Sequence, residues 1–277
     1  MDYGLKPEDY VEPRCLLCDE PYGAGPQAKP VPRQRIIEKM NAYMARRDYA
    51  GAERHLLYWL EEAVLGRDSR GELMLRGELI GHYRKVGNRE KALENVEKVL
   101  DLIRVMDYED TISAGTAYVN AATACNAFGE NERSLELFEK ARKIYASSPG
   151  TDPSLLGGLY NNMALTLTAL GRTGEAMELY DKAVTCMRKV PGGHLEEAIT
   201  CLNMADALVQ DGGMEKHEEK IYALLDRACD LLEDQGEAEA GYYAFVLEKC
   251  APVLSWYGYF AAAGEFREKA EKIYAGT

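Results

Sequence analysis

The apolar and polar positions of this chain repeat with a long period. Five glycines each end an apolar stretch with helical spacing, and they follow one another at intervals of 42, 42, 41 and 46 residues: Gly87, Gly129, Gly171, Gly212 and Gly258. Small residues stand five positions after four of them: Ala92, Ser134, Ala176 and Ala263. The segment 139–146 also returns almost unchanged at 268–275. Self-similarity at such a period indicates a helical-repeat protein.

Each period predicts a helix, a tight turn and a second helix packed antiparallel on the first. Glycine suits the left-handed backbone position that ends a helix, and we expect this role at all five glycines. Small residues let two helix axes approach closely. One helix pair is too small to bury its own apolar face, so neighbouring pairs must stack. An earlier unit without the glycine fits residues 36–66, which makes about six helix pairs in an all-α protein.

One segment carries a family resemblance. Residues 160–183, YNNMALTLTALGRTGEAMELYDKA, resemble a tetratricopeptide repeat. The period of about 42 residues exceeds the usual 34 and is similar to that of the longer repeats of kinesin light chains and of bacterial peptide-pheromone receptors. The resemblance extends over residues 33–277 and implies a right-handed superhelical solenoid, whose first helices line a concave surface.

Residues 1–32 differ from the rest of the chain. Six prolines exclude a long helix there: Pro7, Pro13, Pro21, Pro26, Pro30 and Pro32. Apolar and aromatic residues are frequent in the same segment, which favours an extended strap along the solenoid over a solvated tail. We therefore divide the chain into an extended segment, 1–32, and a solenoid, 33–277, and the strap is a candidate occupant of the solenoid's own groove.

Composition and charge narrow the function. The 277 residues carry 33 Lys and Arg against 46 Asp and Glu, a net charge of −13. Such a molecule repels phosphate groups, so we expect no nucleic-acid partner and no anionic membrane. The chain has no run of about 18 apolar residues, and its start lacks the pattern of a secretion signal. The seven cysteines, an odd number, do not form a disulfide framework. These features predict a cytoplasmic location.

Candidate catalytic chemistry is sparse. The chain has no phosphate-binding glycine loop, no H-E-x2-H element and no G-x-S-x-G element. Its four histidines are scattered, and many carboxylates are spaced three or four residues from Lys or Arg, as on a solvated helix face. We therefore expect no enzymatic activity.

Cys15 and Cys18 form a C-x2-C pair in the N-terminal segment. The pair is open to three interpretations, which are a structural or incidental role, two ligands of a zinc ion, or a redox dithiol. A tetrahedral zinc site needs four ligands, and the remaining two would come from His55, His82 or a second chain.

Asparagines recur inside the first helices of three successive units. Asn120, Asn162 and Asn203 each lie nine residues before the glycine of their unit, so they share one register across the array. An amide side chain can pair with both the N–H and the C=O of an extended peptide. The family resemblance implies that asparagines at this place hold ligand backbone. Capping or packing between helices is the alternative role for these side chains.

Neighbouring positions on the same face complete the candidate site. The predicted peptide-binding residues are Thr116, Asn120, Asn126, Asn161, Asn162, Leu165, Asn203 and Asp206. This face lacks the cluster of Lys and Arg that clamps a terminal carboxylate, which favours an internal or partly apolar peptide. The sequence therefore predicts an adaptor or scaffold that binds another protein or an extended peptide. The alternative is a peptide-responsive regulator of signalling or transcription that acts through a partner.

Overall fold

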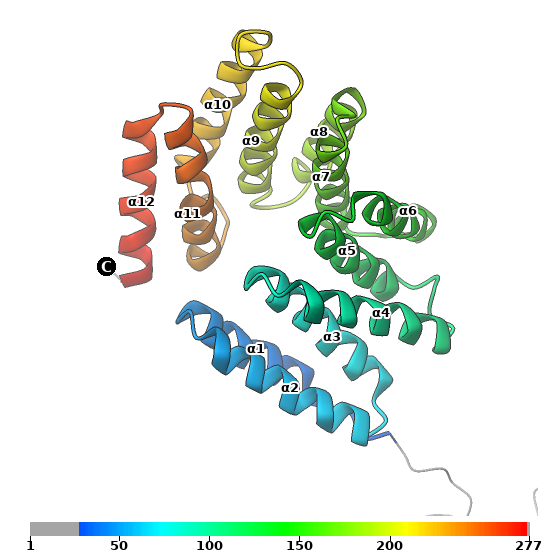
Figure 1. Cartoon of the computed structure of the whole chain (residues 1–277). Helices are drawn as coiled ribbons and strands as arrows, with labels where there is room; N and C mark the ends of the chain where they lie inside the picture. Colours follow the sequence, from blue (N-terminus) through cyan, green and yellow to red (C-terminus); the bar gives the residue numbers. More distant parts are fainter. Residues whose placement is uncertain (1–27, 276–277) are drawn as a thin grey trace, which may run out of the picture. The chain divides into compact units, whose positions relative to one another are not determined.

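The computed structural model describes residues 28–275, and every regular element among them is a helix (Figure 1). The twelve helices of this range are α1 (Arg33–Ala45), α2 (Tyr49–Leu65), α3 (Ser69–Lys85), α4 (Arg89–Val105), α5 (Ile112–Ala127), α6 (Asn131–Ser147), α7 (Pro153–Ala169), α8 (Thr173–Met187), α9 (His194–Gln210), α10 (Glu218–Leu232), α11 (Ala240–Trp256) and α12 (Phe260–Ala275). The expected all-α fold of helix pairs is thereby confirmed. Within residues 28–275, no helix combines the length and apolar character needed to cross a membrane.

The described residues form two compact units, 28–79 and 80–275. In the described part of the first unit, α1 packs on α2, and the residues before α1 are tied to the turn that precedes α3. The Val31 N–H donates to Asp68 Oδ2 at 3.0 Å, while the Gly71 N–H and the Arg33 guanidinium donate to Asp68 Oδ1 at 2.9 and 3.2 Å. Burial raises the pKa of Asp68, but these hydrogen bonds and the Arg33 charge outweigh burial and hold the pKa below its usual value.

The second unit is a series of antiparallel helix pairs, in which α5 packs on α6, α7 on α8, α9 on α10 and α11 on α12. The first helices of successive pairs also contact one another, α5 with α7, α7 with α9 and α9 with α11 (Figure 1). We call the surface of α5, α7, α9 and α11 the first-helix wall. It presents side chains of successive pairs next to one another.

The core of the pairs contains the small residues that the period predicted. All four are fully buried: Ala92, Ser134, Ala176 and Ala263. Large residues such as Phe138 and Tyr180 fill the space beside them and are also fully buried, which contributes about 2–3 kcal/mol for each side chain. Ser134 does not leave its hydroxyl unpaired, because Oγ donates to the Ala122 carbonyl at 2.8 Å and lies 3.2 Å from Thr166 Oγ1.

Glycine ends the first helix of a pair in the left-handed conformation, as expected, at four of the five positions. The φ angles are 73° at Gly87, 80° at Gly129, 73° at Gly171 and 89° at Gly258. The prediction for Gly212 was wrong, because the neighbouring Gly213 adopts the positive φ of 87°. The loop between α9, which ends at Gln210, and α10 is longer than the other turns within pairs. It contains a 2.6 Å ion pair between Lys216 and Asp211, and its left-handed residue comes one position later than expected.

The turn between α1 and α2 has no glycine, and Arg47 takes the left-handed conformation there with φ 56°. A non-glycine residue in this region costs about 1–2 kcal/mol. The packing of α1 on α2 compensates for that strain.

Candidate functional site

Two of the three asparagines in the predicted row present their amides without an internal partner. Asn120 is exposed on α5 and Asn162 is half-buried on α7. Neither side chain makes a hydrogen bond to another residue in the described range 28–275. Since α5 and α7 are neighbours in the first-helix wall, both amides can pair with a ligand that lies across these helices.

The third asparagine of the row is engaged within the protein. Asn203 Nδ2 donates to Asn161 Oδ1 at 3.0 Å, and Thr200 Oγ1 donates to the same oxygen at 3.2 Å. These bonds join α7 to α9 across two successive pairs. Asn203 therefore has its Oδ1 left for a ligand, and Asn161 has its two N–H donors.

The other predicted peptide-binding residues have varied surroundings. Thr116 is half-buried on α5, where Oγ1 donates to the Ile112 carbonyl at 3.2 Å and lies 3.0 Å from the Tyr145 hydroxyl of α6. Asn126 on α5 and Leu165 on α7 are half-buried. The peptide-binding role of all these residues stays a prediction.

Asp206, the last of them, lies in a cleft between α9 and α11. The cleft has a volume of about 460 Å³ and is lined by Asp206, Val209, Gln210, Pro252, Val253 and Trp256. Trp256 is a large apolar side chain that is 70% exposed. The cleft is thus an apolar hollow with one carboxylate in it.

Tyr257 connects the carboxylate and the indole of this cleft. Its hydroxyl donates to Asp206 Oδ1 at 2.7 Å, and its ring stands edge-on to the Trp256 ring with centroids 4.6 Å apart. Tyr257 itself is buried. Burial raises the pKa of Asp206, and the Tyr257 hydrogen bond opposes that rise only in part.

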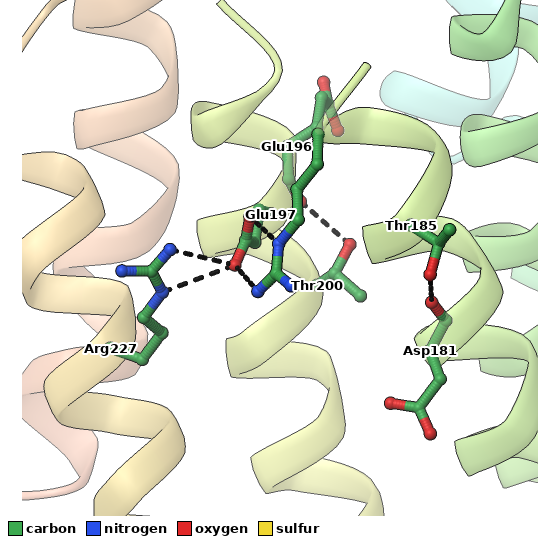
Figure 2. Close-up of polar contacts among 7 residues, drawn as sticks. Asp181, Thr185, Glu196, Glu197, Thr200 and Arg227 are labelled. Carbon is green, nitrogen blue, oxygen red and sulfur yellow. Dashed lines mark hydrogen bonds and ion pairs between the residues drawn. The ribbon is translucent and has the colours of Figure 1, made fainter. Parts of the chain in front are cut away.

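A buried ion cluster holds the first turns of α9 (Figure 2). The Glu197 side chain is 3% exposed, and its carboxylate accepts from Arg188 at 2.6 and 3.0 Å and from Arg227 at 3.2 and 3.3 Å. Arg188 follows α8, and Figure 2 shows the Arg227 guanidinium reaching across from α10. Side chains from α10 and from the residue after α8 therefore meet at one carboxylate of α9, which ties the first turns of α9 to both neighbours.

A larger groove lies between α6, α7 and α8. It has a volume of about 740 Å³, and charged side chains of both signs line it. Five carboxylates and five basic side chains line it, and two pairs of them are joined, since Arg172 bonds Glu175 twice at 2.7 Å and Arg142 lies 2.8 Å from Glu139. The groove consequently lacks an unbalanced charge that would select a ligand, and we favour the first-helix wall as the binding surface.

Sequence reasoning missed Pro252, Val253 and Trp256 as site residues, although a register argument could have found two of them. Pro252 lies six residues before Gly258, as Asp206 lies six before Gly212. Trp256 and Gln210 each lie two residues before the same glycines. Because equal registers occupy equivalent places in a repeat array, this argument would have placed the four positions near one another.

The proposed metal ligands Cys15 and Cys18 lie outside the described residues. Within 28–275, no three side chains of His, Cys, Asp or Glu converge in a way that could hold a metal ion. His55 Nε2 lies 3.1 Å from the Ile36 carbonyl, and its ring packs against Tyr43. The cysteines of the described range are free thiols, and burial raises the pKa of Cys125 and Cys201 to about 11.

Comparisons with known proteins agree with this fold. The tetratricopeptide repeat model matches residues 157–192, which include Asn161 and Asn162. No curated protein matches the chain. A crystal structure of kinesin light chain TPR-like repeats from Podosopora anserina is 22% identical, covers 75% of this chain and 96% of its own, and has a TM-score of 0.50.

Two further solved structures are similar. A variant of the Podosopora anserina protein is 21% identical with a TM-score of 0.51, at 75% coverage of this chain and 96% of its own. BtubC (BKLC) from P. vanneervenii is 18% identical, covers 89% of this chain and 92% of its own, and has a TM-score of 0.47. Residues 157–192 therefore match a tetratricopeptide repeat, and the all-α fold of the chain is similar to the solved structure of kinesin light chain TPR-like repeats.

Proposed function

We propose that this protein is an adaptor or scaffold that binds a partner protein through an extended peptide segment along the first-helix wall of residues 80–277. One observation carries the proposal. Asn120 and Asn162 stand in the same register of neighbouring first helices, and neither amide has an internal hydrogen-bond partner in the described range. Asparagine is a poor helix former compared with alanine, so its recurrence inside two helices favours a role outside the fold.

The chemistry of the amide suits a peptide backbone. Each asparagine side chain offers two N–H donors and one oxygen acceptor, so it can pair with the C=O and N–H of one residue of an extended chain. Such pairing contributes affinity without reading the partner's side chains, while pockets beside the amides supply selectivity. The cleft between α9 and α11 adjoins the same wall, because Asp206 lies one helical turn after Asn203 on α9.

Charge favours a protein partner over a nucleic acid or an anionic membrane. The net charge of −13 repels phosphate groups that come within about one Debye length of the protein surface. The same charge attracts basic segments of other proteins.

The proposal can be tested with a displayed library of random 12-residue peptides, selected on the purified full chain and then measured by fluorescence polarisation. We expect the variant Asn120→Ala/Asn162→Ala to bind the selected peptides at least about thirtyfold more weakly, since four hydrogen bonds of about 0.5–1.5 kcal/mol each, at least about 2 kcal/mol together, are removed. Asn41→Ala is the matched control, because Asn41 is an exposed helical asparagine on α1 of the other unit.

A second measurement separates backbone pairing from indirect effects. Each amide of a selected peptide is N-methylated in turn, which removes one backbone N–H. Methylation at the positions facing the asparagines should weaken binding to the natural protein and change binding to the double variant little. The proposal fails if the library yields no binding peptide, or if the double variant binds the selected peptides as tightly as Asn41→Ala does.

A further inference from the structure

The cleft between α9 and α11 contains a negative charge that the protein does not neutralise. Asp206 is half-buried, and its Oδ1 accepts from the Tyr257 hydroxyl, a neutral donor, at 2.7 Å. No Lys, Arg or His of the described range forms an ion pair with Asp206. By contrast, the deeply buried Glu197 has two arginines. Removing a carboxylate from water without a counter-ion is unfavourable, so Asp206 is set up to receive one.

The rest of the cleft suits the aliphatic part of a long basic side chain. Val209, Pro252 and Val253 provide apolar walls. Lys and Arg bury their methylene stems along such surfaces while the charged head reaches a polar group. The volume of about 460 Å³ is ample for one such side chain together with water.

Trp256 adds a second feature that selects a cation. Its indole is 70% exposed at the cleft, and the buried Tyr257 ring supports it edge-on. Tryptophan gives the strongest cation–π attraction among the aromatic side chains. Because Tyr257 contacts both the indole and Asp206, the two groups that would hold a cation are positioned by one residue.

We infer that this cleft is a selectivity pocket for a lysine or arginine side chain of the bound peptide. The inference rests on the proposed function and specifies its ligand. The bound peptide segment carries a basic residue where it passes the cleft, one helical turn beyond Asn203 along the first-helix wall. Asp206 supplies the counter-charge and Trp256 the aromatic face. An apolar side chain in the cleft would desolvate Asp206 further without compensation, and an acidic side chain would be repelled by it.

The test uses one peptide selected from the library on the full chain. The residue that occupies the cleft is located by substituting each position in turn, and it is then varied as lysine, arginine, norleucine and glutamate. Norleucine keeps the unbranched stem and lacks the amine. We expect the natural protein to prefer lysine over norleucine about tenfold and to reject glutamate.

Two variants and one control assign that preference to the cleft. Asp206→Asn should reduce the ratio of lysine to norleucine affinity from about ten to about three, because the counter-charge is lost while the aromatic face of Trp256 remains. Trp256→Leu should reduce the ratio about threefold through the lost aromatic face, and this exposed position leaves the fold undisturbed. The control is Asp226→Asn on α10, whose carboxylate also accepts a tyrosine hydroxyl, from Tyr259 at 2.6 Å, and which removes the same charge outside the cleft.

Each outcome has a distinct meaning. Peptides that bind the wall without any preference for lysine or arginine would overturn this inference and leave the proposed function standing. An equal loss of the ratio in Asp226→Asn and Asp206→Asn would assign the preference to overall charge and likewise overturn the pocket. Failure of every peptide to bind would instead remove the proposed function itself.

Discussion

Substitutions on the two sides of the Glu197 ion cluster should lower the free energy of unfolding by different amounts. The Glu197 side chain is 3% exposed, whereas those of Arg188 and Arg227 are 61% and 48% exposed. In Arg188→Ala/Arg227→Ala, the carboxylate stays buried without a partner, which costs about 3–5 kcal/mol. In Glu197→Gln, the two guanidinium groups regain water, and the loss is only about 1–2 kcal/mol of hydrogen-bond energy. The arginine variant should therefore be the less stable one by about 2–3 kcal/mol.

The pH dependence that Glu197 gives to stability should differ in sign between the natural protein and the double arginine variant. In the natural protein, burial raises the pKa of Glu197, but the hydrogen bonds and charges of Arg188 and Arg227 outweigh it and the pKa is lowered. This group therefore contributes stability above the unfolded-state pKa of about 4.3, and the contribution is lost as the pH falls through the folded-state pKa. Without the arginines only burial acts, so the pKa of Glu197 rises above the unfolded value and protonation relieves the variant as the pH falls.

Urea unfolding followed by circular dichroism at pH 7 and pH 5 measures both effects. We expect the deficit of the double arginine variant to shrink at pH 5. The deficit of Glu197→Gln should stay nearly constant, because both pH values lie above the folded-state and unfolded-state pKa of Glu197 in the natural protein. The comparison requires that the natural protein and the variants have the same dependence of unfolding free energy on urea concentration. If Glu197→Gln proves as destabilising as the arginine variant, or if the arginine deficit is the same at both pH values, the carboxylate is not a buried anion that depends on these partners.

Further predictions concern the asparagines, the turns and the thiols. Asn161→Ala should cost about 0.5–1.5 kcal/mol, because two donors lose the Oδ1 acceptor between α7 and α9, whereas Asn120→Ala should leave urea stability within about 0.5 kcal/mol. Gly129→Ala should cost about 1–2 kcal/mol from backbone strain alone, since φ is 80° and no atom lies within 4 Å of an added Cβ; a neutral effect would contradict the left-handed turn. At pH 8, Cys125 and Cys201 should react with iodoacetamide far more slowly in the folded protein than in urea, because burial raises the pKa of both thiols to about 11. Peptide mapping by mass spectrometry measures that ratio, and equal rates in both states would contradict burial.

Local pattern alone was enough to predict the helix pairs. The spacing of glycines and small residues depends on contacts within one pair, where partners are close in sequence and the geometry of an antiparallel turn is nearly constant. Ser134 and Ala176 are accordingly buried at the pair contact, as expected. The one error in the turns, Gly212 in place of Gly213, arose where the connection between α9 and α10 is longer than in the other pairs.

Contacts between pairs were decided only by the tertiary structure. Equal register placed Asn162 and Asn203 in one row, yet Asn203 bonds Asn161, 42 residues away, and the carboxylate of Asp206 meets Tyr257, 51 residues away. The small rotation from each helix pair to the next decides which of two adjacent side chains, such as Asn161 or Asn162, a residue of the next pair contacts. That rotation is set by the summed packing of the interface and by anchors such as Glu197, so the repeat period determines the order of the pairs, and the packing between them determines which side chains form a site.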